Sequence, residues 1–210
     1  MRVVVDWDGT VTVRDSLVQV IHEFGDPALL AELEPRVGVD LTLHEEIALE
    51  FRAITAPLAE VVRWVVEHVE VRPGLRELAE LDPLVISAGF HELIEPVLAR
   101  EGVELEVLAN RLDTRPDGWV VRFRDETACT TCGEPCKRGS LAGEPYVYAG
   151  DGYSDRCAAL AADRVFARDS LATHLDGLGV AYEPFEDLYE LAAPLSGAVE
   201  RPSLRRGRKT

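Results

Sequence analysis

The stretch that decides the fold is Val3-Val4-Val5-Asp6-Trp7-Asp8-Gly9-Thr10, close to the N-terminus. Its three β-branched apolar residues predict a short buried strand, and the polar, glycine-containing residues after them predict a turn. Asp6 and Asp8 are two positions apart on an extended chain, so their carboxylates can face the same space. Because two carboxylates that close repel each other, a cation or a shared proton must lie between them. The stretch therefore predicts a strand that ends in a candidate cation site, although for this stretch taken alone an ordinary turn or helix cap is the preferred interpretation.

Two later strands are predicted to end in the same way. Leu84-Val85-Ile86 leads into Ser87-Ala88-Gly89, and Tyr146-Val147-Tyr148-Ala149 leads into Gly150-Asp151-Gly152. Helical patterns separate these strands, which is typical of a parallel sheet covered by helices on both faces. Ligands of open α/β sheets bind at the carboxyl ends of the strands. We therefore expect the three turns to converge on one site.

One part of the chain departs from this alternation of strands and helices. From about residue 14 to residue 72 the apolar residues recur with helical spacing throughout, and no strand is predicted there. The sequence therefore predicts a helical insert at 14–72 within an α/β core formed by 1–13 and 73–195. Residues 196–210 are basic and lack an apolar period, so we expect them to form a flexible tail.

The composition limits the partners of the protein. The 210 residues carry a formal net charge of −16, which disfavours binding to nucleic acid or to an anionic membrane. No apolar run approaches the roughly 20 residues needed to cross a bilayer, and the N-terminus leads directly into a strand instead of resembling a signal peptide. We therefore expect a cytoplasmic protein that acts on a small molecule.

Four motifs of the chain resemble those of the haloacid dehalogenase superfamily. Residues 6–12 resemble the first motif, Ser87 the second, Lys137 the third, and 150–155 the fourth, in the same order. The resemblance extends to about Leu191. It implies a Rossmann-like parallel sheet core with a small helical cap at the insert. It also implies a magnesium-dependent phosphatase that forms an aspartyl-phosphate intermediate.

The resemblance assigns a role to each motif residue. Asp6 is expected to be the nucleophile and Asp8 the general acid and base, and dehalogenases of the family lack this second aspartate. Lys137, one of only two lysines, is expected to neutralise the phosphoryl oxygens and to hold Asp6. The expected phosphate-binding residues are Thr10, Ser87, Ala88, Gly89 and Lys137. The expected magnesium ligands are Asp6, Asp8, Asp151 and Asp155, the last either directly or from behind the others.

Other residues beside the motifs or in the insert are candidates for contact with the substrate. For each of them, an ordinary packed or solvated side chain is the alternative interpretation. These candidates are Trp7, Asp15, Arg52, Phe90, His91 and Tyr153, with Arg14, Ser16 and His44 as further residues of the insert.

The cysteines form a separate motif. Cys129, Cys132 and Cys136 are spaced C-x2-C-x3-C, and Cys157 follows the fourth motif. Four cysteines can hold a structural zinc ion, but a second C-x2-C pair is absent. A disulfide is unexpected in a reducing compartment. We therefore expect buried thiols rather than zinc or a disulfide.

The cysteine segment also narrows the resemblance within the family. Together with residues 165–169 and 182–189, it is similar to the phosphatases of methionine salvage that act on 2-hydroxy-3-keto-5-methylthiopentenyl-1-phosphate. Phosphoserine phosphatases share the cap type and the first and fourth motifs. The implied substrate is a small phosphorylated metabolite, and phosphoserine, phosphoethanolamine and phosphocholine remain alternatives. A phosphotransferase or mutase, and a non-catalytic protein that binds phosphometabolites, also remain open, as does a homodimer.

Overall fold

A seven-stranded sheet runs through the part of the chain that the structure, a computed structural model, describes: residues 1–141 and 143–197. The strand order is β4-β3-β2-β1-β5-β6-β7, with β1 at the centre. All neighbouring strands in the sheet pair in parallel except β3 and β4, which form an antiparallel hairpin. The strands are β1 Arg2–Val5, β2 Leu84–Phe90, β3 Glu106–Asp113, β4 Val120–Arg122, β5 Tyr146–Gly150, β6 Arg164–Ala167 and β7 Glu183–Pro184. This architecture confirms the predicted α/β fold.

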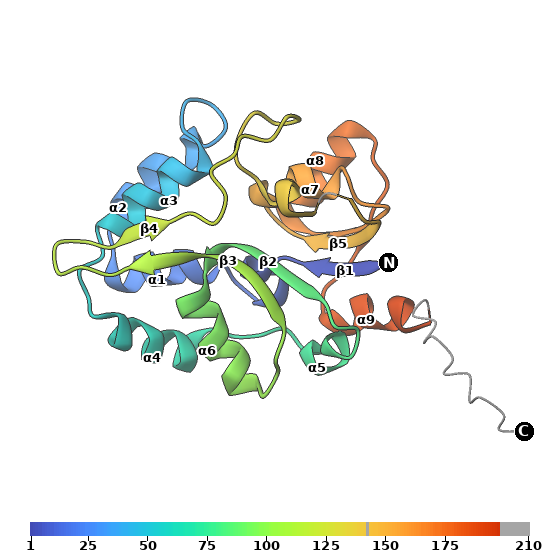
Figure 1. Cartoon of the computed structure of the whole chain (residues 1–210), viewed down its shortest axis with the longest axis horizontal. Coiled ribbons are helices and arrows are strands. Elements are labelled where there is room, and N and C mark those ends of the chain that lie inside the picture. The colour runs from blue at the N-terminus through green and yellow to red at the C-terminus, as the bar shows by residue number, and fades with distance from the viewer. Residues whose placement is uncertain (142, 198–210) are drawn as a thin grey trace, which may run out of the picture.

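Helices cover both faces of the sheet. Figure 1 shows α5, α6 and α9 on one face and α7 and α8 on the other. Val3 and Val5 of β1 pack in one buried cluster and Val4 packs in another, as the alternation of side chains along a strand requires. The helices are α1 Ser16–Phe24, α2 Pro27–Leu33, α3 Leu43–Arg52, α4 Leu58–His68, α5 Leu75–Ala79, α6 His91–Glu101, α7 Arg156–Ala159, α8 Asp169–Leu178 and α9 Leu188–Ser196. Among the described helices, none has the length and apolar character that a membrane span requires.

The helical insert begins and ends at one place on the core. Thr12 and Val71 form an antiparallel bridge, and Val13 donates a backbone hydrogen bond of 2.9 Å to Glu70. The segments that enter and leave α1–α4 therefore lie side by side. The tail predicted at 196–210 lies almost entirely outside the described residues; Ser196 is the last residue of α9.

The β3–β4 hairpin packs against the insert. Trp119 donates its backbone N–H to Ile54 and its indole N–H to the backbone oxygen of Ala56, at 3.2 and 3.0 Å. His44 of α3 stacks on Phe123, with 3.9 Å between the ring centroids. The hairpin thus fixes α3 above the carboxyl ends of the central strands.

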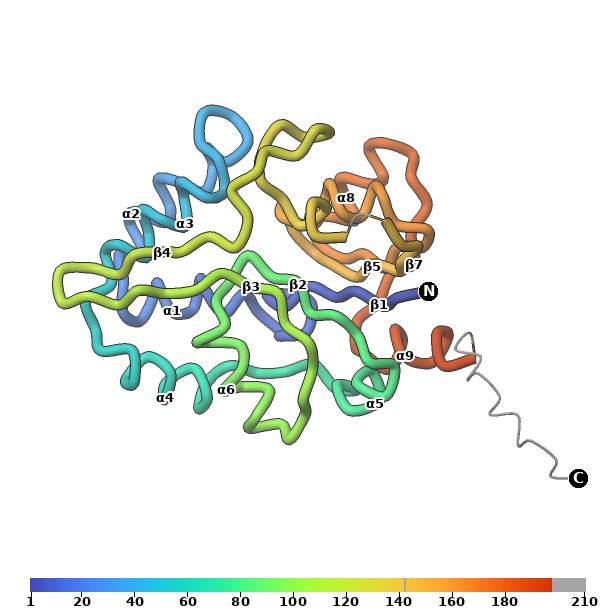
Figure 2. Tube along the Cα trace, viewed as in Figure 1, coloured from blue at the N-terminus to red at the C-terminus, as the bar shows by residue number. Residues whose placement is uncertain are grey.

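The chain that follows the hairpin returns to the centre of the sheet. Figure 2 traces it from β4 through an extended loop to the neighbourhood of α8 and β5. This connection contains the short helical turn Lys137–Leu141, which contacts both α7 and β2. A long connection with little regular structure therefore carries Lys137 to the centre of the sheet.

Candidate functional site

The turn after β1, Trp7–Val11, is a wide loop that is closed by a hydrogen bond of 3.0 Å from the backbone N–H of Thr12 to the oxygen of Trp7, and the backbone angles of Asp8 and Gly9 within it are not helical. Gly9 lies in this turn with a φ of 72°, which L side chains rarely adopt. A Cβ atom at Gly9 would lie 2.2 Å from Oδ2 of Asp151. Glycine is therefore required here for the backbone to pass so close to a carboxylate.

Arg72 holds the same turn from behind. Its buried guanidinium donates to the backbone oxygens of Thr10 and Gly9 at 3.0 and 3.1 Å, and also to those of Val13 and Glu186. Arg72 was not predicted from the sequence, because 62 residues separate it from Thr10. We find no pattern in the sequence that would have identified it.

Three carboxylates meet where β1 and β5 end. Asp6, Asp151 and Asp155 each contribute an oxygen, and these three oxygens lie within 4.8 Å of one another. Burial, followed by repulsion from Asp155, raises the pKa of Asp6 well above its usual value. Carboxylates held this close favour a bound cation, and oxygen donors are those that Mg²⁺ prefers.

Lys137 places one positive charge within this group. Its Nζ donates to Asp6 Oδ1 at 2.5 Å and to Asp155 Oδ1 at 2.6 Å, and its side chain is 4% exposed. Burial would lower the pKa of this lysine, but the charges of Asp155 and Asp6 outweigh burial and raise it. Lys137 therefore stays protonated between the two carboxylates.

Asp155 is saturated with hydrogen bonds. Besides Lys137, the hydroxyl of Tyr148 donates to Oδ1 at 2.6 Å, and the backbone N–H groups of Asp151 and Gly152 donate to Oδ2 at 2.9 Å. Four donors occupy about all the acceptor positions of a carboxylate. This arrangement favours a supporting position for Asp155, behind any bound cation.

Asp151 is the more open carboxylate of this loop. Thr10 donates its hydroxyl to Asp151 Oδ1 at 2.9 Å. Burial, followed by repulsion from Asp155, raises the pKa of Asp151 to about 7. Thr10 was expected to bind phosphoryl oxygens; the structure instead places its hydroxyl on Asp151, where it orients that carboxylate.

Asp8 points away from the three carboxylates. Its Oδ1 accepts hydrogen bonds from the backbone N–H of Ser16, at 2.9 Å, and from the Ser16 hydroxyl, and its Oδ2 lies 3.4 Å from the Ser87 hydroxyl. Burial raises the pKa of Asp8 and the Ser16 hydrogen bonds oppose this rise. The turn that follows Asp6 directs the Asp8 carboxylate toward α1, so the group of close carboxylates consists of Asp6, Asp151 and Asp155 and does not include Asp8.

The cavity beside these groups has a volume of about 430 Å³. Asp6, Asp8 and Asp151 line its floor, and residues of α1 to α3 line its walls. Among the expected substrate contacts, Asp15 and Tyr153 lie on this cavity.

Four other expected contacts lie elsewhere. Trp7 and Phe90 are 1% and 0% exposed and pack in the hydrophobic core. His91 bonds to Glu95 and to a backbone N–H of β3, and the exposed Arg52 lies beside the β3–β4 hairpin. For these four residues the structure favours the alternative interpretation of an ordinary packed or solvated side chain, because adjacency to a motif does not fix the direction of a side chain. His44 lines a second cavity of about 300 Å³, together with Ser87, Lys137 and part of the cysteine cluster.

The cavity of about 430 Å³ contains two buried glutamates that were not predicted from the sequence. Glu46 and Glu50 of α3 are 7% and 5% exposed, and Glu50 Oε1 has no hydrogen-bond partner among the described residues. Burial raises the pKa of Glu46 to about 7, and burial together with repulsion from Glu46 raises that of Glu50 to about 8. Their positions beside the apolar Ile47 and Phe51 on the buried face of the helix were the available indication.

The four cysteines come together at the edge of the site, as free thiols. Cys157 is buried, whereas Cys129 and Cys136 are partly exposed and Cys132 is exposed. The expectation of four buried thiols therefore holds for Cys157 alone.

Comparisons with known proteins identify the family of the chain. The family haloacid dehalogenase-like hydrolase matches residues 3–160, more than half of the chain. Two similar proteins, from Bacillus mycoides (strain KBAB4) and Exiguobacterium sibiricum, are named 2-hydroxy-3-keto-5-methylthiopentenyl-1-phosphate phosphatase. The first is 26% identical over 215 residues, covering 95% of this chain and 98% of the relative. The second is 27% identical over 210 residues, covering 91% and 94%.

Solved structures show the same fold. A phosphoserine phosphatase from T. onnurineus has a TM-score of 0.66 at 21% identity, covering 92% of this chain and 93% of that one. A substrate-bound phosphoserine phosphatase complex has a TM-score of 0.69 at 15% identity, covering 92% and 97%. Sequence family and fold thus agree with the motif resemblance, and the chain belongs to the haloacid dehalogenase-like hydrolases.

Proposed function

We propose that this hydrolase is a magnesium-dependent phosphatase that cleaves a small phosphomonoester through a phosphorylated Asp6. The observation that carries the proposal is the opposite orientation of two aspartates two positions apart, the buried Asp6 and the partly buried Asp8. Asp6 faces Lys137 and the other carboxylates, whereas Asp8 faces Ser16 and Ser87. One carboxylate is thus placed for attack and the other for proton transfer. The phosphatase names of the relatives support the same reaction.

The donor set of the site fits a magnesium ion. Asp6 and Asp151 would hold the ion, with Asp155 behind them, because the hydrogen bonds of Asp155 already occupy its oxygens. The bound ion would supply positive charge for the phosphoryl oxygens at a site where Lys137 faces several carboxylates.

In the first step, a carboxylate oxygen of Asp6 forms a bond to phosphorus while the bond from phosphorus to the ester oxygen breaks. Protonated Asp8 gives its proton to the departing alkoxide. The raised pKa of Asp8 is consistent with this role, because burial favours the protonated form. Lys137 balances the charge of the attacking group, and Ser87 with the backbone of Ala88 would contact the phosphoryl oxygens from the cavity wall.

In the second step, water attacks phosphorus and its proton passes to the Asp8 carboxylate. The bond between Asp6 and phosphorus breaks, which releases inorganic phosphate and restores Asp6. Ser16 would keep Asp8 in position through both steps, since it holds Oδ1 with two hydrogen bonds. Ser16, which was a candidate for contact with the substrate, is therefore proposed to position Asp8 instead.

The first candidate substrate is the compound named in the relatives, 2-hydroxy-3-keto-5-methylthiopentenyl-1-phosphate. Apolar side chains of the cavity wall could receive an apolar tail of this kind; they are Leu17, Val18, Ile21, Leu30, Val37, Leu43 and Ile47.

A specific observation favours a second candidate, a phosphomonoester that carries an amine. Glu34, Glu46 and Glu50 line the cavity, and the buried Oε1 of Glu50 lacks a partner. A protonated amine would provide the missing hydrogen bond and the opposite charge. Phosphoethanolamine and phosphocholine are compatible in charge, and only the former can donate a hydrogen bond. The glutamates would repel the carboxylate of phosphoserine, because Arg156 is the only basic side chain among the described residues that line the cavity.

The test is phosphate release from a panel that contains these four compounds, with magnesium and with chelator. The proposal predicts magnesium-dependent release that Asp6→Asn abolishes and that Asp117→Asn, an exposed residue outside both cavities, leaves unchanged. Selectivity for an amine ester that Glu50→Gln lowers would favour the second candidate, and selectivity for the methylthiopentenyl ester would favour the first. Release that survives Asp6→Asn would refute the mechanism.

A further inference from the structure

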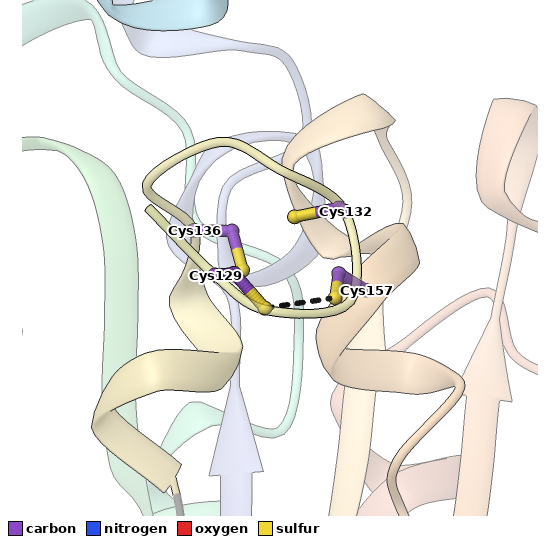
Figure 3. Close-up of side chains that lie close together, drawn as sticks. All are labelled: Cys129, Cys132, Cys136 and Cys157. Carbon is purple, nitrogen blue, oxygen red and sulfur yellow. Dashed lines mark hydrogen bonds between the residues drawn. The ribbon is translucent and has the colours of Figure 1, made fainter. Parts of the chain in front are cut away.

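The four cysteines form a compact group built from two separate segments. Cys129, Cys132 and Cys136 come from the loop before Lys137, and Cys157 comes from α7 (Figure 3). Their four sulfur atoms all lie within 4.8 Å of one another. These are all the cysteines of the chain, so every thiol of the protein points to one place.

The spacing of the sulfurs fits a single tetrahedral ion. Zinc–sulfur bonds of about 2.3 Å in a tetrahedron place the sulfurs about 3.8 Å apart. The sulfurs of Cys129 and Cys157 are 3.8 Å apart. A disulfide needs about 2.05 Å and would use two of the four sulfurs. The group as a whole therefore has the donor number and size of a tetrathiolate site.

The loop is also built to direct its sulfurs inward. The backbone N–H of Gly133 donates to the oxygen of Cys129 at 2.8 Å, and Gly133 has a φ of 81°. This tight turn brings Cys129 and Cys132 to the same side. The backbone N–H of Thr131 points at the sulfur of Cys129 at 3.4 Å, a hydrogen bond that favours a thiolate.

We propose that Cys129, Cys132, Cys136 and Cys157 bind one zinc ion with a structural role. Four thiolates favour zinc or iron, and a complete set of four protein ligands leaves no open position for a substrate. The structure thus favours zinc over the unliganded thiols expected from the spacing of the cysteines alone.

The site would join the two segments that carry the active-site ion pair. Cys136 directly precedes Lys137, and Cys157 lies two residues after Asp155. Nζ of Lys137 binds Asp155 at 2.6 Å. A zinc ion between the segments would hold this contact in place and would restrict the irregular loop that leads to Lys137. This effect on catalysis rests on the proposed phosphatase function, whereas zinc binding itself does not.

The test measures metal content and ligand type without reference to activity. Protein made in zinc-containing medium and purified without chelator is expected to contain about one zinc per chain by elemental analysis. Cobalt(II) added to metal-stripped protein is expected to give the absorption of tetrahedral thiolate coordination. Thr130→Ser, an exposed change in the same loop, should keep both properties, whereas Cys129→Ser and Cys157→Ser should lose them.

Three results would overturn the proposal. They are folded protein with four titratable thiols and no metal, a mass that shows a disulfide, and stoichiometric iron in place of zinc. If the cysteine variants fail to fold, the cobalt spectrum and native mass of the unmodified chain still decide the question. Zinc with no phosphate release would refute the phosphatase function and leave the zinc site standing. Magnesium-dependent phosphate release by protein that holds no zinc and has four free thiols would refute the zinc site and leave the phosphatase function standing.

Discussion

Replacement of Glu50 by glutamine tests whether the ionised Glu50 side chain, in the wall of the cavity, destabilises the fold. Glu50 is 5% exposed and its Oε1 lacks a partner among the described residues, so the ionised form is poorly solvated in the fold. Burial, followed by repulsion from Glu46, raises its pKa from the usual value of 4.5 to about 8. Glutamine has nearly the same shape and carries no charge at any pH.

The size and sign of the effect follow from this difference in pKa. Below pH 4.5 Glu50 is neutral in both the folded and unfolded states, so its charge costs nothing. Stability is lost as the pH rises from 4.5 to about 8, because only the unfolded chain ionises freely over that range. At about 1.36 kcal/mol per pKa unit the loss has a ceiling of about 5 kcal/mol. Since Glu50 lines a cavity that solvent can enter and screen, we expect about 2–3 kcal/mol.

The assay is chemical or thermal unfolding of Glu50→Gln and of the unmodified chain at pH 5 and pH 8. We expect the substitution to raise the midpoint at pH 8 by about 5–10 °C and to change it little at pH 5. Glu60→Gln, an exposed change on α4, should have no such pH-dependent effect. An equal shift at both pH values, or no gain at pH 8, would refute the inference that Glu50 is buried without a partner.

Three further predictions concern the catalytic groups. Lys137→Met should lower stability by about 3–5 kcal/mol, since it leaves buried carboxylates unpaired, and should lower kcat by about 100-fold or more. Gly9→Ala should raise the magnesium concentration for half-maximal activity by about 10-fold or more. Gly102→Ala, with a similar φ of 69° and open space at the Cβ position, should not. Ser16→Ala should raise the pKa of Asp8 and move the pH optimum up by about 0.7 unit, the equivalent of one hydrogen bond.

Each of these predictions has a clear opposite result. Unfolding curves for Lys137→Met that match the unmodified chain would show that the lysine is not needed to pair the carboxylates. If Gly9→Ala and Gly102→Ala raised the magnesium requirement by the same factor, the effect at Gly9 would come from backbone strain and not from a clash with Asp151. No change in either variant would show that the close approach of Gly9 to Asp151 does not affect magnesium binding. An unchanged pH optimum in Ser16→Ala, measured with saturating magnesium, would remove the positioning role of Ser16.

The sheet and its site were predictable because local patterns encode them. The apolar residues before Asp6 give a strand, and parallel strands bring their carboxyl ends to one edge, so Asp6 and Asp151 had to be near each other. Lys137 was identified through the rarity of lysine in the chain and through the family motif. Its loop has little regular structure, and no periodicity indicates where such a loop ends.

Contacts between distant segments were not predictable from the sequence. Arg72 reaches the turn after Asp6 across the whole insert, and the contact of Trp119 with Ala56, which holds the hairpin beside α3, joins residues 63 positions apart. The directions in which side chains point could not be predicted from the sequence either. Trp7 and Asp8 are adjacent in the chain, yet one packs in the core and the other faces the cavity.

The measurement that tests the central claim most directly is the trapping of the phosphorylated enzyme. The hydrolase is mixed with its best panel substrate and magnesium and quenched with acid. It is then reduced with borohydride, which converts an aspartyl-phosphate to homoserine, and the peptide that contains residue 6 is sequenced by mass spectrometry. The mechanism predicts homoserine at position 6 and none in the chelator control. Steady phosphate release with an unmodified Asp6, or with the modification at another aspartate, would contradict the assignment of Asp6 as the nucleophile.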